Sequence, residues 1–126
     1  MDLADLDVLI VDDHEAMRAL LQRVLAKAGV AHVRAAASGD EALAALRERP
    51  ATLILADNNM PGMNGMAFLK AVRGESGFGA PKVIMVSGNV GEAHALDAKA
   101  AGADDVLVKP VAPSALLEAI NALFAV

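Results

Sequence analysis

Unbroken runs of valine, isoleucine and leucine recur along the chain. A run of about four to eight apolar residues without polar alternation is typical of a strand that is buried on both faces, as in a parallel sheet. The sequence therefore predicts buried strands over residues 8–11, 52–56, 82–86 and 106–108. Residues 31–36 are smaller and more polar, and we expect them to form a fifth strand at an edge of the sheet.

Between these runs the apolar positions change to a helical spacing. One face of the first predicted helix carries Met17, Leu20, Leu21, Val24, Leu25 and Ala28. Gly29 follows directly, and glycine often ends a helix in this position. Further helices are predicted over residues 40–49, 65–73, 91–101 and 114–124. The glycine-rich segment 74–80 is expected to be a surface loop.

Strands and helices thus alternate along the whole chain. Such alternation predicts a doubly wound α/β fold, in which a five-stranded parallel sheet with right-handed crossovers carries helices on both faces. A length of 126 residues suits one domain, which we assign to 1–126. Ligands of such sheets bind beyond the carboxyl ends of the strands.

Polar side chains follow four of the predicted strands at those ends. Asp12 and Asp13 follow the first, Asp57 the third, Ser87 the fourth and Lys109 the fifth. Three carboxylates in one crevice repel one another, and a hard divalent cation relieves the repulsion. Mg²⁺ suits this site best, because it prefers oxygen ligands and combines one or two carboxylates with phosphate oxygens.

This set of residues favours phosphoryl chemistry. Asp57 would attack phosphorus as a carboxylate nucleophile, while Lys109 and Ser87 hold phosphoryl oxygens. The backbone carbonyl of Asn59 would complete the metal shell. Each residue also has an ordinary interpretation, since aspartate and serine begin turns or cap helices and a single lysine is usually solvated. The functional interpretation depends on all of them occupying corresponding strand ends.

Charge and composition narrow the partners. A net charge of -5 and an aromatic content of 2% argue against nucleic acid as the main partner, since phosphate binding needs basic clusters and base stacking needs rings. The first residues lack the basic and apolar regions of a signal peptide, and no segment approaches the roughly 20 apolar residues that cross a bilayer. We therefore expect a cytoplasmic protein that does not act at a membrane. The absence of cysteine suits a reducing compartment.

Several short motifs lie at the strand ends, and together they are specific. They are Asp12-Asp13, Asp57 with the segment Met60-Pro61-Gly62-Met63-Asn64-Gly65, Ser87-Gly88, Ala100-Ala101-Gly102-Ala103 and Lys109-Pro110. With them the chain resembles, over its whole length, a receiver domain of the two-component response-regulator family. The resemblance implies the strand order 2-1-3-4-5 of flavodoxin-like sheets, which is already known for this family.

The resemblance also implies roles for the residues. Asp57 would take a phosphoryl group from a histidine of a partner kinase or phosphotransfer protein. Asp13, Asp57 and the Asn59 carbonyl would hold Mg²⁺, and Asp12 would act directly or through a metal-bound water. The Lys109–Pro110 bond is typically cis in this family, which X-Pro bonds permit at modest cost. Ser87 would move toward the phosphoryl group on activation.

One position departs from the family pattern. Receivers commonly carry Tyr or Phe three residues before the lysine, whereas this chain has Val106. The chain's aromatics are Phe68, Phe78 and Phe124, and none can replace that ring from the last strand. The switch residues would be Ser87 and Val106, with backbone shifts around 87–92 and in the helix at 92–101. By the same resemblance, Asn59 and Asn89 lie where the family tunes how fast the acyl phosphate hydrolyses.

Other candidate residues favour ordinary roles. His14 is expected in solvent at a helix start, although it could overhang the acidic pocket. His32 and His94 have no second ligand at metal-binding spacing and are expected to be surface or packing residues. The three methionines of segment 60–66 are expected to fill space beneath the loop, with a contact surface as the alternative.

The sequence thus predicts a single-domain response regulator that catalyses only its own phosphorylation and dephosphorylation. Its output would be a protein-binding surface on the last two helices and the strand between them, read by a separate target, and the protein would be a monomer or weak dimer. Two alternatives stay open, a small Mg²⁺-dependent aspartyl-phosphate phosphohydrolase and a receiver fragment of a larger hybrid kinase or regulator. A nucleotide-binding domain is disfavoured, because Asp12-Asp13-His14-Glu15 replaces its glycine-rich first turn.

Overall fold

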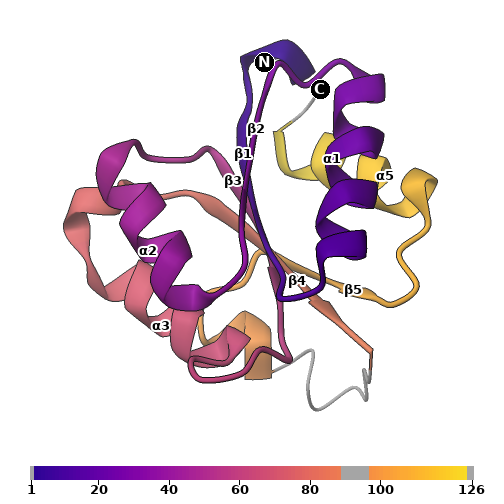
Figure 1. The fold of residues 1–126 in the computed structure, drawn as a ribbon. Helices are drawn as coiled ribbons and strands as arrows, with labels where there is room; N and C mark the ends of the chain where they lie inside the picture. The colour runs from indigo at the N-terminus through magenta and orange to yellow at the C-terminus, as the bar shows by residue number, and fades with distance from the viewer. Residues whose placement is uncertain (1, 89–96, 125–126) are drawn as a thin grey trace.

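A parallel five-stranded sheet lies between two layers of helices (Figure 1). This computed structural model describes residues 2–88 and 97–124. The strands are β1 (Asp7–Val11), β2 (His32–Ala36), β3 (Leu53–Asp57), β4 (Lys82–Ser87) and β5 (Asp105–Val108). They lie in the order β2-β1-β3-β4-β5, and every neighbouring pair is parallel. The predicted fold class and strand order are confirmed.

The helices begin and end close to the predicted positions. They are α1 (Glu15–Ala28), α2 (Gly39–Glu48), α3 (Gly65–Gly74) and α5 (Pro113–Phe124), with short 3-10 turns at η1 (Leu3–Asp5) and η2 (Ser76–Phe78). Most of the helix predicted over 91–101 lies outside the described residues. Its described part is helical at residues 97–100. Within residues 2–88 and 97–124, no helix is both long and apolar enough to cross a membrane.

Local sequence explains where these helices begin and end. The Ser38 side chain accepts a hydrogen bond from the Glu41 N–H at the start of α2, and Asn64 accepts one from the Ala67 N–H at the start of α3. Such caps satisfy backbone donors that a helix leaves unpaired. Gly29 ends α1 with φ of 106°, a left-handed conformation that glycine adopts without steric cost.

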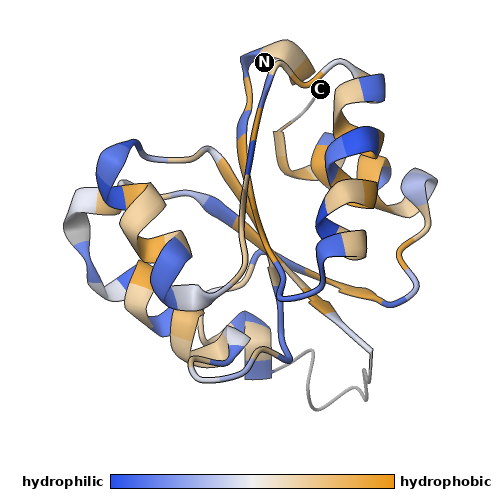
Figure 2. Ribbon diagram, in the orientation of Figure 1, coloured by the Kyte–Doolittle hydropathy of each residue, from blue (hydrophilic) through white to orange (hydrophobic). Residues whose placement is uncertain are grey.

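The central strands β1, β3 and β4 are buried on both faces, which explains their unbroken apolar runs. Helices α1 and α5 cover one face, and α2 and α3 cover the other (Figure 1). Along β1 the side chains alternate: Val8 and Ile10 join the cluster under α1 and α5, whereas Leu9 and Val11 join the cluster under α2 and α3. Apolar colour accordingly follows the strands and the inner sides of the helices in Figure 2. A strand of this kind has no solvent face to carry polar residues.

Three expectations about exposure are wrong. Leu20 was predicted on the core face of α1 but is 44% exposed. The helix turns about 100° per residue, so Leu20 lies at the margin of a stripe that Leu21 and Leu25 centre on the sheet. Strand β5 is not buried on both faces, because it is an edge strand, and Val108 is 53% exposed. The segment 74–80 is not simply a surface loop, because Phe78 is buried in the core.

The position of α1 generates a stability prediction. Leu25→Ala should lower the free energy of unfolding by about 2–5 kcal/mol, because it removes a fully buried side chain and leaves a cavity. Leu20→Ala is the matched control on the same helix and should change it by less than about 1 kcal/mol. Urea denaturation measures both. Equal losses in the two variants would contradict this orientation of α1.

Candidate phosphoryl-transfer site

The carboxyl ends of β1, β3, β4 and β5 meet at one edge of the sheet. Backbone hydrogen bonds continue beyond the strand pairing and tie these ends together. The Asn58 N–H donates to the Val86 carbonyl at 2.9 Å, and the Lys109 N–H donates to the Ser87 carbonyl at 2.8 Å. Ser87 and Asp57 are the last residues of their strands. The sheet therefore fixes the relative positions of the predicted site residues before any side chain is considered.

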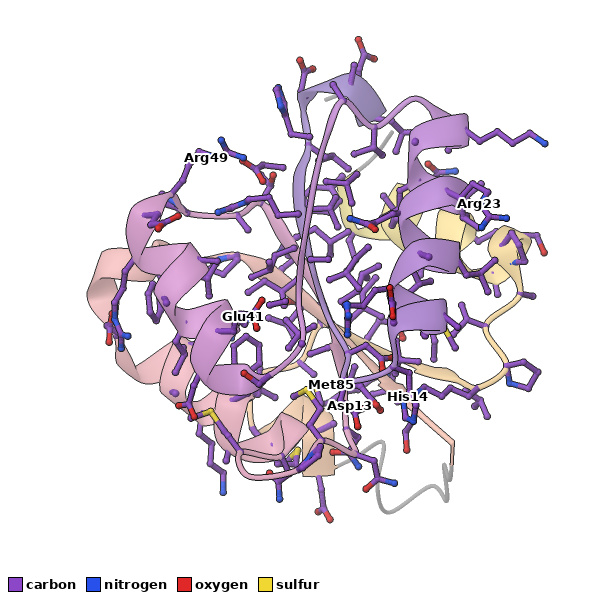
Figure 3. The ribbon with its side chains drawn as sticks, in the orientation of Figure 1. Asp13, His14, Arg23, Glu41, Arg49 and Met85 are labelled. Atoms are coloured by element: carbon purple, nitrogen blue, oxygen red, sulfur yellow. The ribbon has the colours of Figure 1, made fainter. Side chains whose placement is uncertain are left out.

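Three carboxylates gather at this edge. Asp12 and Asp57 are each only 2% exposed, and Asp13 is partly buried. One oxygen from each of the three and a ring nitrogen of His14 all lie within 4.8 Å of one another. Figure 3 shows Asp13 and His14 together at the start of α1, at this end of the sheet. The predicted convergence of the acidic residues is thus observed.

Lys109 supplies positive charge to the cluster. Its Nζ lies 3.2 Å from Oδ2 of Asp57 and 3.5 Å from Oδ2 of Asp12. The side chain is largely shielded from solvent, so its attraction to the carboxylates is screened less than at an open surface. The Lys109–Pro110 peptide bond is cis, as the resemblance implies.

Two buried oxygens of the cluster are incompletely satisfied. Asp57 Oδ1 accepts a hydrogen bond from the Asn59 N–H at 3.1 Å, which orients the carboxylate. Within the described part of the chain, Asp57 Oδ2 and Asp13 Oδ1 have no hydrogen-bond partner. The 3.2 Å contact with Lys109 is an ion pair by distance but is not aligned as a hydrogen bond. Buried charges of this kind are expensive unless paired or bound to a metal.

The residues therefore fit Mg²⁺. The donor set is rich in oxygen, its acids repel one another, and two of its buried oxygens have lone pairs to offer. Asn59 lies on the exposed loop directly after Asp57, with its N–H engaged by the Asp57 carboxylate. Its carbonyl as a metal ligand stays a prediction.

Two further side chains contact the site, and only the contact of Arg18 was not anticipated from the sequence. His14 is exposed at the start of α1 as expected, and its Nδ1 lies 3.1 Å from Oδ1 of both Asp12 and Asp13, as in the alternative in which it overhangs the acidic pocket. Arg18 donates a hydrogen bond from its guanidinium to the Asp12 carbonyl at 2.9 Å and so holds the β1–α1 loop. His14 and Arg18 are four residues apart, which is about one helical turn, so they lie on the same side of the helix start, over the end of β1. This spacing is the sequence signal that could have indicated the Arg18 contact.

A cavity of about 320 Å³ adjoins the site. Ser87 and Val106 both line it, together with Met66 and Met85. Two of the three phenylalanines, Phe68 and Phe78, are buried in the cluster under α2 and α3, and Phe124 packs in the cluster under α1 and α5. The two residues expected to act as the switch thus face a common space.

The start of α3 packs against the loop that carries Asp57. A Cβ atom on Gly65 would lie 2.5 Å from the Asp57 carbonyl oxygen and 2.7 Å from the Asn58 Cα. These are closer than real contacts, so only glycine allows α3 to approach the loop this closely. The Gly65 N–H also donates to the Asn58 carbonyl at 3.1 Å. Gly65 therefore positions the loop that carries Asp57.

Comparison with known proteins decides the family. The model of the response regulator receiver domain matches residues 8–121. The chain belongs to the response regulator receiver family. The receiver is 36% identical over 115 residues to the chemotaxis protein CheY1 of Helicobacter pylori, covering 90% of this chain and 93% of the relative. It is 34% identical over 125 residues to a probable chemotaxis protein CheY of Rhizobium etli, covering 98% and 97%.

Solved structures agree with the receiver fold. Chemotaxis protein CheY4 of Vibrio cholerae superposes with a TM-score of 0.88 at 35% identity, covering 94% of this chain and 98% of the other. A putative response regulator from Chloroflexus aurantiacus superposes with a TM-score of 0.88 at 30% identity, covering 96% and 98%. The resemblance drawn from motifs alone is thereby confirmed at the level of family and fold.

The remaining sequence predictions fall into two groups. Met60 is buried, and the other methionines of the segment, Met63 and Met66, pack against the same core cluster, so their expected role as filler beneath the loop is confirmed. His32 is exposed at the start of β2, as expected. Asn89, His94 and most of the region expected to shift on activation lie outside the described residues.

Gly65 in the receiver generates a testable prediction. Gly65→Ala should lower the free energy of unfolding by about 1–3 kcal/mol, because the added methyl group forces α3 away from the Asp57 loop. Gly74→Ala, at the other end of α3, meets no atom within 4 Å and should leave stability unchanged or raise it by up to about 1 kcal/mol. Urea denaturation compares the two. A neutral Gly65→Ala variant would show that the close packing is not required.

Proposed function

We propose that this receiver accepts a phosphoryl group on Asp57 and passes the signal to a separate protein. The observation that carries the proposal is the Asp57 carboxylate itself, 2% exposed, with Lys109 Nζ 3.2 Å from Oδ2 and two further acids beside it. A purely structural aspartate at a strand end needs one hydrogen-bonded partner and no second acid. An incoming phosphoryl group carries negative charge that has to be neutralised. Lys109, together with a cation held by the acids, would supply the positive charge.

The chemistry is a transfer between two residues. An oxygen of Asp57 attacks the phosphorus of a phosphohistidine on a kinase or phosphotransfer protein. The phosphorus–nitrogen bond breaks, its electron pair goes to the imidazole nitrogen, and an acyl phosphate forms on Asp57. Oδ1 accepts the Asn59 N–H, which would hold the carboxylate in position for the attack. In dephosphorylation, water attacks phosphorus and the carboxylate leaves with inorganic phosphate as the product.

The surrounding side chains bind and orient the phosphoryl group. Lys109 would move from its carboxylate contacts to a phosphoryl oxygen, and the Ser87 hydroxyl would donate to another. Asp12, Asp13, Asp57 and the Asn59 carbonyl would hold Mg²⁺. When bound, this ion neutralises negative charge on the phosphoryl oxygens.

The proposal extends to partners and output. The donor would be a histidine kinase or phosphotransfer protein, and the output a protein-binding surface around β5 and α5. The relatives named as chemotaxis proteins support a signalling role rather than metabolic turnover. The chain would catalyse only its own phosphorylation and dephosphorylation, act in the cytoplasm and be a monomer or weak dimer. Asn59 and Asn89 would tune the lifetime of the acyl phosphate.

Replacement of the phosphoacceptor tests the proposal directly. Asp57→Asn should abolish acid-labile phosphate uptake from a cognate histidine kinase or a small phosphodonor, because the amide cannot attack phosphorus. Asp40→Asn, which changes an exposed aspartate in the first turn of α2, should label like the unmodified protein. Intact-mass spectrometry at neutral pH measures the added phosphoryl group. Equal labelling of Asp57→Asn would show that another residue is the acceptor, and sustained phosphate release from small phosphoesters would instead indicate a phosphohydrolase.

The cavity beside Ser87 generates a prediction about the switch. Val106→Tyr should change the free energy of unfolding by less than about 1 kcal/mol, because the new ring enters a cavity of about 320 Å³. Val83→Tyr, on the same face of the sheet but with no exposed surface, should cost at least about 2 kcal/mol through overpacking.

The functional arm of this comparison uses beryllofluoride as a phosphoryl analogue. Amide hydrogen exchange in β5 should differ more between the free and beryllofluoride-bound forms of Val106→Tyr than of the unmodified protein. The reason is that a ring in the cavity transmits movement of Ser87 to β5, whereas valine leaves space between them. The same exchange difference in both proteins would show that the ring plays no part in the switch.

A further inference from the structure

His14 lies where a metal ligand would lie. Its Nδ1 is 3.1 Å from Oδ1 of Asp12 and 3.1 Å from Oδ1 of Asp13. All three atoms, with an oxygen of Asp57, lie within 4.8 Å of one another. The proposed Mg²⁺ site explains the acids but assigns nothing to this nitrogen. The question is whether the imidazole only hydrogen-bonds the carboxylates or binds the same ion.

The distances match ligands that share one ion. Neighbouring ligands of an octahedral ion at about 2.1 Å are about 3.0 Å apart, and opposite ligands are about 4.2 Å apart. The two nitrogen–oxygen distances of 3.1 Å fit two edges of one octahedron, and the His14–Asp12 distance is also that of a hydrogen bond. The whole group spans up to 4.8 Å, so its side chains would have to move closer together to enclose one ion. Coordination would also satisfy the partly buried Asp13 Oδ1, which has no hydrogen-bond partner in the described part of the chain despite its contact with His14.

A second observation points to a ligand. Asp57 is 2% exposed, and its Oδ2 is buried at the centre of the cluster without a hydrogen-bond partner among the described residues. The cluster is therefore more than a group of exposed acids. It holds a buried carboxylate oxygen whose contact with Lys109 at 3.2 Å is not a hydrogen bond, and His14 lies at the solvent edge of the cluster.

We propose that His14 is an additional ligand of this metal site and makes the site select first-row transition ions, such as Mn²⁺, Co²⁺ or Ni²⁺, over Mg²⁺. Imidazole nitrogen suits Ni²⁺ in particular, and the affinity of a mixed nitrogen and oxygen site rises from Mn²⁺ through Co²⁺ to Ni²⁺. Mg²⁺ instead prefers oxygen and keeps its waters. The His14 side chain is 67% exposed, so its ring can turn toward an ion without disturbing the core. The inference rests on the proposed function, because it concerns the same ion.

The experiment compares ion affinities in matched variants. Isothermal titration of metal-free protein with Ni²⁺ and with Mg²⁺ gives a ratio of affinities. His14→Asn should lower this ratio by about tenfold or more while changing Mg²⁺ affinity by less than about threefold. His32→Asn is the control, because His32 is exposed and lies beside Asp7, at the end of β1 opposite to the site. The ratio of Ni²⁺ to Mg²⁺ affinity should be the same in His32→Asn as in the unmodified protein.

A spectroscopic measurement identifies the ligand itself. Pulsed electron paramagnetic resonance of bound Mn²⁺ should detect coupling to an imidazole ¹⁴N nucleus in the unmodified protein and in His32→Asn, but not in His14→Asn. A structural role for His14, holding Asp12 and Asp13 by hydrogen bonds, would alter affinity for both ions alike and leave no nitrogen coupling. Either result, an unchanged ratio or absent coupling, overturns the inference.

Failure of this inference can be distinguished from failure of the proposed function. If Asp57 is phosphorylated, and the ratio of Ni²⁺ to Mg²⁺ affinity is the same in His14→Asn and in the unmodified protein, only the role of His14 is wrong. If no divalent ion binds and Asp57 takes up no phosphoryl group, the proposed function is wrong and the inference falls with it.

Discussion

The structure depends on holding three carboxylates together at one edge of a parallel sheet. Asp12, Asp13 and Asp57 repel one another, and two of them are almost fully buried. The cost is offset locally by Lys109, whose Nζ contacts both buried acids. Packing of the rest of the molecule also offsets the repulsion. Helices pack on both faces of the sheet, so the strand ends cannot separate without opening the core. Binding of a cation would relieve a strain that packing maintains.

That constraint explains why the fold was largely predictable. A parallel strand buried on both faces leaves an unbroken apolar run, and all five strands were placed to within one residue at each end. Errors arose where exposure depends on tertiary neighbours. Leu20 has the spacing of a core residue but lies beyond the reach of the sheet, and Phe78 lies in a glycine-rich segment yet fills space beside α2 and α3. Neither follows from local sequence.

For the site, the sequence predicted which residues converge but not how their side chains are directed. Parallel topology brings all carboxyl strand ends to one edge, so the convergence of Asp12, Asp57 and Lys109 followed once the strands were known. Side-chain directions did not follow. The contact of His14 with the two acids depends on how α1 leaves β1, and the cavity beside Val106 depends on which way the edge strand turns its side chains. The close approach at Gly65 likewise depends on how α3 packs, and periodicity carries no information about it.

Substitutions in the buried interior of the site and substitutions at its exposed rim should have different effects. Asp12 and Asp57 are buried and paired with Lys109, so a substitution there disturbs charge balance and folding together. His14 and Asn59 stand at the rim in contact with solvent, where a substitution leaves the core intact. Under the proposed function, Asn59 and His14 would act from this rim on the lifetime of the acyl phosphate and on ion preference. These two properties could then differ between receivers whose buried acids and lysine stay the same.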